Sequence, residues 1–145
     1  MTAMTDYLEG QVITHLFRTG TLTKPAEIAN SLASADPGEG ATGASHNELT
    51  STGSYARIAR DPLDANWTAA ASGTTDNAAA ITFATATANW SSTVTHTTLL
   101  DESTTLTSGT AANVWFKGAL TVSKTVSNGD VFQFPTGNFD VQIDN

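Results

Sequence analysis

The chain has 145 residues, the size of one ordinary domain, and it carries a formal net charge of −8 with six lysines and arginines. So few basic side chains argue against nucleic acid, which needs clustered Lys and Arg to displace phosphate counterions, and against an anionic membrane surface. The absence of cysteine excludes disulfides, cysteine-based zinc sites and thiol catalysis. No apolar run approaches the roughly 20 residues that span a bilayer.

The first segment has the apolar spacing of an amphipathic helix, predicted over about residues 6–18. Its apolar residues fall on one face at a period of 3.6: Leu8, Val12, Ile13, Leu16 and Phe17. Thr5 or Asp6 can cap the start, and a left-handed Gly20 can close the last turn. Three turns are not stable alone, so this face must dock. The chain's own sheet is the first expectation, and a neighbouring subunit is the alternative.

Residues 36–54 are rich in Gly, Ser, Thr, Ala and Pro and have few large apolar side chains. This composition predicts a long exposed loop that either lies on a partner or moves freely. His46 and Glu48 lie two residues apart within it. Two ligands in a loop fall far short of a metal site, so both are treated as interface candidates.

From residue 54 onward, short strand signals alternate with turn signals about every ten residues, which is typical of a β-sandwich or barrel. The predicted strands lie within residues 26–35, 55–60, 79–83, 94–100, 113–122, 131–134 and 139–143, and a weaker segment starts at Trp67. In the last strand the apolar residues Phe139, Val141 and Ile143 alternate with Asp140, Gln142 and Asp144. Asn128-Gly129 predicts a type I′ hairpin turn. We therefore expect a single all-β domain over residues 1–145: a jelly-roll-like β-sandwich of about eight short strands with one N-terminal α-helix.

The residues that carry chemistry are scattered. His15, His46 and His96 lie in separate segments, and Asp101-Glu102 is an adjacent acidic pair of the kind that is usually solvated. Gly-rich phosphate loops and nucleophile elbows are absent from the sequence. We expect a protein with no enzymatic activity, no cofactor and no metal.

Aromatic side chains are the more prominent feature. Trp67, Trp90 and Trp115 occupy separate segments and suit either a core or an interface anchor. The predicted interface residues, taken together, are Leu8, Val12, Leu16, His46, Glu48, Trp67, Trp90 and Trp115.

Several motifs together resemble a family of small phage virion proteins, labelled tail fibre or capsid cement proteins. In chain order they are Tyr7–Glu9, Ile13–Arg18, Ala35–Pro37, Gly53–Arg57, Asn77–Phe83, Ala88–Trp90, Val94–His96, Phe116–Leu120 and Lys124–Asp130. Each motif is weak alone, but they cover most of the chain in the family's order.

The resemblance implies a β-sandwich that forms a homotrimer on the outer surface of a virion, after synthesis in the host cytoplasm. The leading hypothesis is a capsid cement or decoration protein that binds the major capsid protein and stabilises the shell. The alternative is a tail-fibre or collar component that takes part in host attachment and binds a host surface ligand. The sequence has no heptad or collagen-like repeat to build a shaft, which favours cement.

Overall fold

The structure, a computed structural model, describes residues 3–102 and 112–143. Within these residues the chain forms one α-helix and nine strands. In chain order they are β1 (Ala3–Met4), α1 (Asp6–Phe17), β2 (Ala29–Ala33), β3 (Ile58–Ala59), β4 (Thr74–Asp76), β5 (Ile81–Thr82), β6 (Val94–Leu100), β7 (Val114–Lys124), β8 (Gln133–Phe134) and β9 (Asp140–Gln142). All the strand pairs among them are antiparallel. The predicted mainly-β fold with one N-terminal helix is confirmed.

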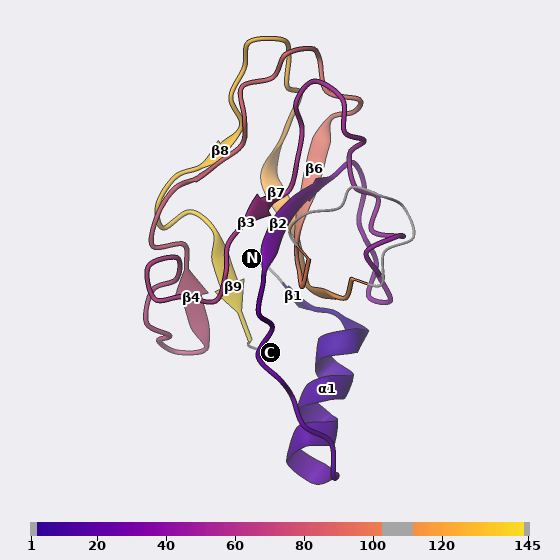
Figure 1. Ribbon diagram of the computed structural model, residues 1–145, viewed down its shortest axis with the longest axis vertical. Helices are drawn as coiled ribbons and strands as arrows, with labels where there is room; N and C mark the ends of the chain where they lie inside the picture. Colours follow the sequence, from indigo (N-terminus) through magenta and orange to yellow (C-terminus); the bar gives the residue numbers. More distant parts are fainter. Residues whose placement is uncertain (1–2, 103–111, 144–145) are drawn as a thin grey trace.

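One layer is a five-stranded sheet in the order β1-β7-β6-β2-β3 (Figure 1). β6 and β7 form its centre, paired from Val94↔Lys124 to Leu100↔Val114 with two shifts of register. β2 runs along the other edge of β6 and is buried over its whole length. Both faces of the sheet are therefore covered at β2, whereas the second half of β7 is mostly exposed.

The second layer consists of two short ribbons, β4 with β9 and β5 with β8, so the fold is sandwich-like and not a closed barrel. The core between the layers is rich in aromatic residues: Tyr55, Phe83, Trp90, Phe132, Phe134 and Phe139. Their rings meet mostly edge to face, as between Phe83 and Phe132, whose centroids are 5.7 Å apart at 85°. Such pairs add to the stabilisation that burial alone provides.

The turn at Asn128-Gly129 forms, but the predicted hairpin around it does not. Gly129 has φ +89° and Asn128 has no positive φ, so this is not a type I′ turn. The flanking strands pair elsewhere, β7 with β6 and β1, and β8 with β5. Instead the turn pairs with Ala86, which accepts from Gly129 N (2.7 Å) and donates to Asp130 O (2.9 Å). A local turn signal could not reveal this distant partner.

Two short strands were not predicted, β1 and β4. β4 follows directly after a turn, in which Ser72 and Gly73 both have positive φ. The turn residues dominate the sequence pattern of this segment and conceal the strand. It is nevertheless held along its length by β9, from Thr74↔Gln142 to Asp76↔Asp140. Asp144, the last polar residue of the predicted C-terminal alternation, lies outside the described residues.

α1 matches its predicted bounds, but the prediction that a left-handed Gly20 closes its last turn was wrong. Arg18, the residue that follows the helix, has extended backbone angles, and Gly20 does not have a positive φ. A Cβ at Gly20 would instead overlap the Thr14 methyl group, so the glycine allows the returning chain to lie close against the helix.

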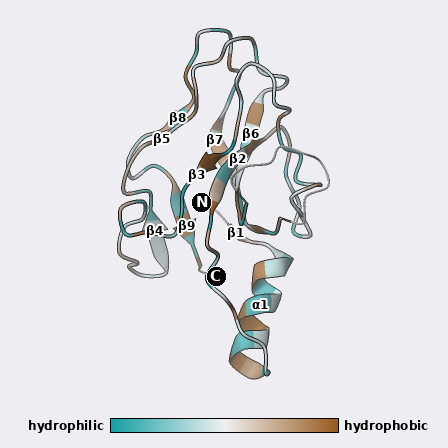
Figure 2. Ribbon diagram, in the orientation of Figure 1, coloured by the Kyte–Doolittle hydropathy of each residue, from teal (hydrophilic) through white to brown (hydrophobic). Residues whose placement is uncertain are grey.

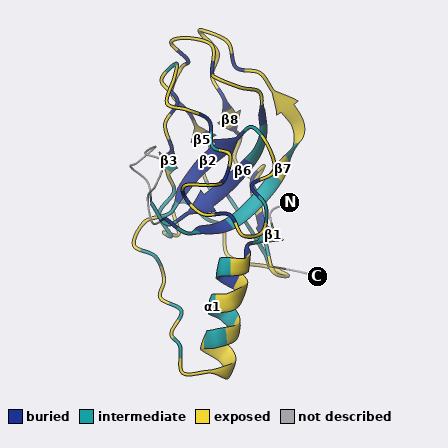
Figure 3. Cartoon of the chain, turned by 90° about the vertical axis from the view of Figure 1, so that its right-hand side faces the viewer, coloured by how far each residue is buried: buried dark blue, intermediate teal, exposed yellow. Residues whose placement is uncertain are grey.

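The first turn of α1 is fixed to the sheet. Thr5 makes no side-chain cap; its hydroxyl donates to Val114 O instead, and its N–H donates to Trp115 O (3.1 Å). Leu8 is buried, and the centroids of the Tyr7 and Trp115 rings are 5.9 Å apart. Beyond this anchor the helix projects away from the β-sandwich (Figures 1 and 3).

Candidate interaction surfaces

The far end of α1 carries three large apolar side chains that the rest of the described chain leaves exposed. Ile13, Leu16 and Phe17 are 57%, 65% and 79% exposed, and we call them the helix tip. Of the predicted face, Leu8 is buried and Val12 half-buried. Figure 2 shows the hydrophobic residues on the projecting helix. Docking of the whole face on the chain's own sheet, the first expectation, is therefore wrong.

The spacing of the helix tip makes it a single patch. Residues three and four apart on a helix are neighbours, so Ile13, Leu16 and Phe17 lie together. Single exposed apolar residues are common on soluble proteins, but a contiguous cluster at the end of a projecting element is typical of a protein contact. The exposed side chains of His15 and Arg18 flank it.

A second apolar surface lies between the two layers, and we call it the apolar groove. It has a volume of about 340 Å³ and is lined mainly by Ile28, Trp67, Leu99, Phe116, Val141 and Ile143. Trp67 forms one wall, held by a hydrogen bond from Nε1 to Arg60 O (3.1 Å). A neighbouring hollow shares Pro62 and Trp67 with the groove and is also lined by Asp64.

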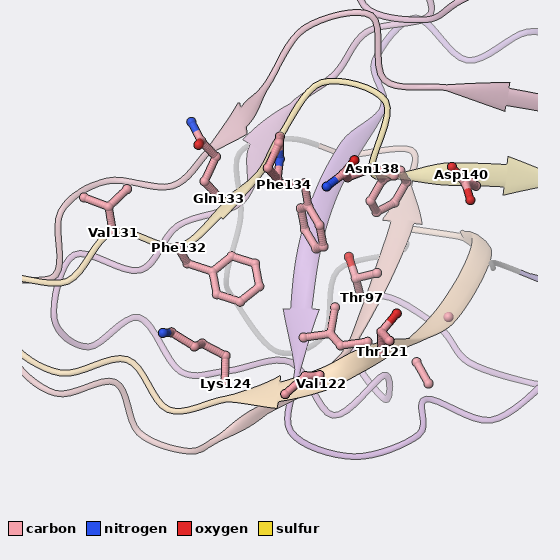
Figure 4. A pocket seen from close by; sticks show the side chains of 15 residues that line it. Thr97, Thr121, Val122, Lys124, Val131, Phe132, Gln133, Phe134, Asn138 and Asp140 are labelled. Carbon is pink, nitrogen blue, oxygen red and sulfur yellow. The ribbon is translucent and has the colours of Figure 1, made fainter.

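A third surface is a pocket of mixed polarity, about 520 Å³, between the second half of β7 and residues 131–140. Thr97 of β6 pairs with Gly118 of β7, and because both residues are small they leave this space open above the sheet. Figure 4 shows the rings of Phe132 and Phe134 on one side of the mixed pocket, facing Thr97 on the other.

The polar side chains around the mixed pocket differ in how they are bonded. The Thr97 hydroxyl is already committed, since it donates to Ser31 O (2.8 Å) and accepts from Asn30. The side chains of Thr121, Lys124 and Asn138 make no hydrogen bond or ion pair within the described residues. They are therefore available to a polar ligand.

His46 and Glu48 belong to a buried charged cluster inside the fold. Arg57 donates to both Glu48 oxygens, from Nε to Oε1 (2.9 Å) and from Nη2 to Oε2 (2.7 Å), and Tyr55 donates its hydroxyl proton to Oε1 (3.0 Å). His46, 1% exposed, bonds Thr42 O through Nδ1 (3.0 Å). Its Nε2 lies 3.2 Å from Glu48 Oε2, within ion-pair distance.

The cluster shifts the pKa values of its members. Burial acts to raise the pKa of Glu48, but the contacts from His46 and Arg57 outweigh it and the net shift is downward. Burial, followed by the Glu48 charge, raises the pKa of Tyr55 well above its usual range. The Tyr55 hydroxyl also accepts from Leu32 N (2.9 Å), so the cluster fastens the predicted loop to β2.

The other two tryptophans lie in the chain's own core. Trp90 donates from Nε1 to Gly53 O (3.1 Å), and Trp115 donates from Nε1 to Asp101 Oδ2 (3.3 Å). Both are buried. Of the three, Trp67 is the one that borders an open surface, where it lines the apolar groove.

Residues 3–102 and 112–143 contain no group of three or more His, Asp or Glu side chains arranged to hold a metal ion. In the same part of the chain, no helix has the length and apolar character needed to cross a membrane.

A match emerges from comparison with protein families. The family described as podophage GP4 fiber I protein gp80 matches residues 3–142, nearly the whole chain. The match confirms the resemblance to small phage virion proteins. Its description favours the tail-fibre alternative over capsid cement, the hypothesis that the sequence put first. A search of curated proteins finds no match.

Proposed function

This chain belongs to the podophage GP4 fiber I protein gp80 family and is a phage virion protein of tail-fibre type, and we propose that it is a non-enzymatic fibre component held in the virion through its helix tip. In this proposal the chain lies on the outer surface of the particle and associates with copies of itself, as a trimer, and with other virion proteins. Its β-sandwich serves as a rigid support for contact surfaces.

One observation carries the proposal: the helix tip projects from an otherwise folded chain with its apolar side chains bare. A short helix gains most of its stability from packing of its apolar face, and here the described chain provides that packing only at the first turn. Covering three large apolar side chains would contribute several kcal/mol to assembly, at about 1.5–3 kcal/mol for each fully buried side chain.

The proposal predicts that the double variant Leu16→Ser, Phe17→Ser folds normally but does not enter virions. Both side chains are exposed, so the free energy of unfolding should change by no more than about 0.5 kcal/mol. Its content in purified particles should fall at least about tenfold, which corresponds to 1.4 kcal/mol of lost contact. Quantitative immunoblotting of particles, together with thermal melting of the purified chain, measures both quantities.

Val122→Ser is the matched control, because Val122 is as exposed as Phe17 but lies on β7. It should enter virions at the wild-type level. If the helix-tip variant did so too, the helix would not be an assembly contact.

A second candidate function is recognition of a host surface ligand at the mixed pocket, which agrees with the attachment role of a tail fibre. The observation that favours it is a set of polar side chains, Thr121, Lys124 and Asn138, that make no bond within the described residues and lie beside an apolar floor. Pockets that orient a ligand commonly combine apolar walls with a few such polar groups.

The double variant Thr121→Val, Asn138→Leu tests this second function. Virions that carry it should assemble with normal chain content, while their adsorption to host cells slows by about tenfold or more, the effect of losing one or two hydrogen bonds. Adsorption is measured as the rate at which free phage disappear from a host culture. A wild-type adsorption rate would remove the mixed pocket from host recognition.

A further inference from the structure

The chain carries two apolar surfaces of complementary form, a projecting helix tip and an apolar groove. We propose that the helix tip of one copy sits in the apolar groove of a second copy, so that copies join head to tail. This inference rests on the proposed function, in which the helix tip is an assembly contact, and it names the partner as another copy of this chain.

The helix tip cannot reach the groove of its own chain. The base of α1 is held to β7 through Thr5, Tyr7 and the buried Leu8. The nine helical residues that follow Leu8 extend about 14 Å beyond this anchor, and the tip lies at the far end, away from both layers (Figures 1 and 3). Contact within one chain would require those anchoring contacts to break, whereas a second copy can approach without any change of fold.

The area available argues for tip-in-groove contact rather than for two tips meeting. The three tip side chains expose roughly 400 Å², the size of one functional patch. Two tips packed on each other would bury only that patch on each copy and leave the apolar groove of both copies open. When the tip enters a groove, each copy uses both surfaces, one toward each neighbour. Such a heterologous contact closes into a ring where the rotation allows it.

An exposed cation beside the helix tip and an exposed carboxylate beside the groove are complementary. Arg18 follows the helix tip and is exposed, while Asp61 and Asp64 flank Pro62 at the edge of the groove. Oδ1 of Asp61 is shielded from solvent and makes no hydrogen bond within the described residues. Lys24, which donates to Pro62 O (3.0 Å), also lies there, as does Arg60, which donates to Asn66 Oδ1 (3.4 Å). The exposed carboxylate of Asp64 is the group that an incoming Arg18 guanidinium would meet.

Cross-linking of the purified full-length chain tests the inference directly. Because the chain has no cysteine, each introduced cysteine is unique. Leu16→Cys and Ile143→Cys chains, which differ in an added tag, are mixed and treated with a short bismaleimide. We expect a mixed dimer that joins the two differently tagged chains. Replacing Ile143→Cys with Val131→Cys, an exposed position on the mixed pocket, should abolish that product.

Charge reversal provides a second measurement. Arg18→Asp alone and Asp64→Arg alone should each lower the yield of mixed dimer at low salt, and combining them should restore it. A product that joins two Leu16→Cys chains, or no mixed dimer at all, would overturn the inference.

Failure of the inference is distinguishable from failure of the proposed function. If the mixed dimer is absent but Leu16→Ser, Phe17→Ser still prevents entry into virions, the helix tip binds a different virion protein and only the inference fails. If that variant enters virions normally, the proposed function fails whatever the cross-linking shows.

Discussion

Replacing Arg57 with methionine is expected to lower the free energy of unfolding by about 3–5 kcal/mol, because it leaves the largely buried Glu48 carboxylate without its counter-ion. The guanidinium makes a bidentate contact with Glu48, and this pair fastens residues 46–48 to the sheet. Urea denaturation of the purified chain measures the change. Lys117→Met is the control, since Lys117 pairs with the exposed Asp36 and Glu39 and should cost no more than about 1 kcal/mol.

The same cluster predicts a pH dependence. The pKa of Glu48 lies below its ordinary value of 4.5, so its ionised form stabilises the fold. That contribution is fully present above about pH 4.5 and is lost as the pH falls through the lower pKa of the folded state. Arg57→Met should lose less stability over this range than the wild type. Equal acid sensitivity of the two proteins would show that the Arg57–Glu48 contact does not stabilise the fold.

Replacing Asn77 with alanine is the second substitution with a large expected effect. Asn77 is fully buried, and its Nδ2 donates to Ala79 O and Pro135 O, both at 2.9 Å. Its Oδ1 accepts from Asn138 N (3.1 Å) and Phe139 N (2.9 Å). Alanine leaves Ala79 O and the buried Phe139 N without these partners, whereas Asn138 N and Pro135 O keep their bond to each other (3.1 Å). We expect a loss of about 2–4 kcal/mol, because each orphaned group costs about 1–3 kcal/mol and relaxation recovers part.

Two further variants define the role of Asn77. Asn128→Ala, at an exposed asparagine whose side chain makes no hydrogen bond in the described residues, should change stability by no more than about 0.5 kcal/mol. Asn77→Asp keeps the acceptor for the two N–H groups but places a carboxylate oxygen against two carbonyls, so it should also be destabilised. Wild-type stability of Asn77→Asp would contradict the assigned hydrogen bonds.

The elements with a clear local period were predictable from the sequence. α1 and β6 lie where the pattern placed them, because the apolar face of the first and the β-branched run of the second are local properties. The alternation of apolar and polar residues around Val141 likewise predicted β9. What these patterns do not contain is the partner of each strand, so the pairing of β9 with β4 could not be foreseen.

The candidate surfaces were predictable only in part. The apolar face of α1 was identified, but which half stays bare depends on where the short β1 fixes the helix against β7. His46 and Glu48 were noticed for their spacing. Arg57, nine residues beyond Glu48, is what turns them from exposed loop residues into a buried cluster. Asn77 was noticed only as part of the Asn77–Phe83 motif, and its buried role could not be predicted, because three of its four partners come from the distant residues 135–139.

Cryo-electron microscopy of the virion tests the central claim most directly. We predict density for this chain in the tail, with the helix tip formed by Ile13, Leu16 and Phe17 covered by another protein surface. Density for the chain over the capsid shell alone, or a helix tip that faces solvent in the assembled tail, would contradict the account.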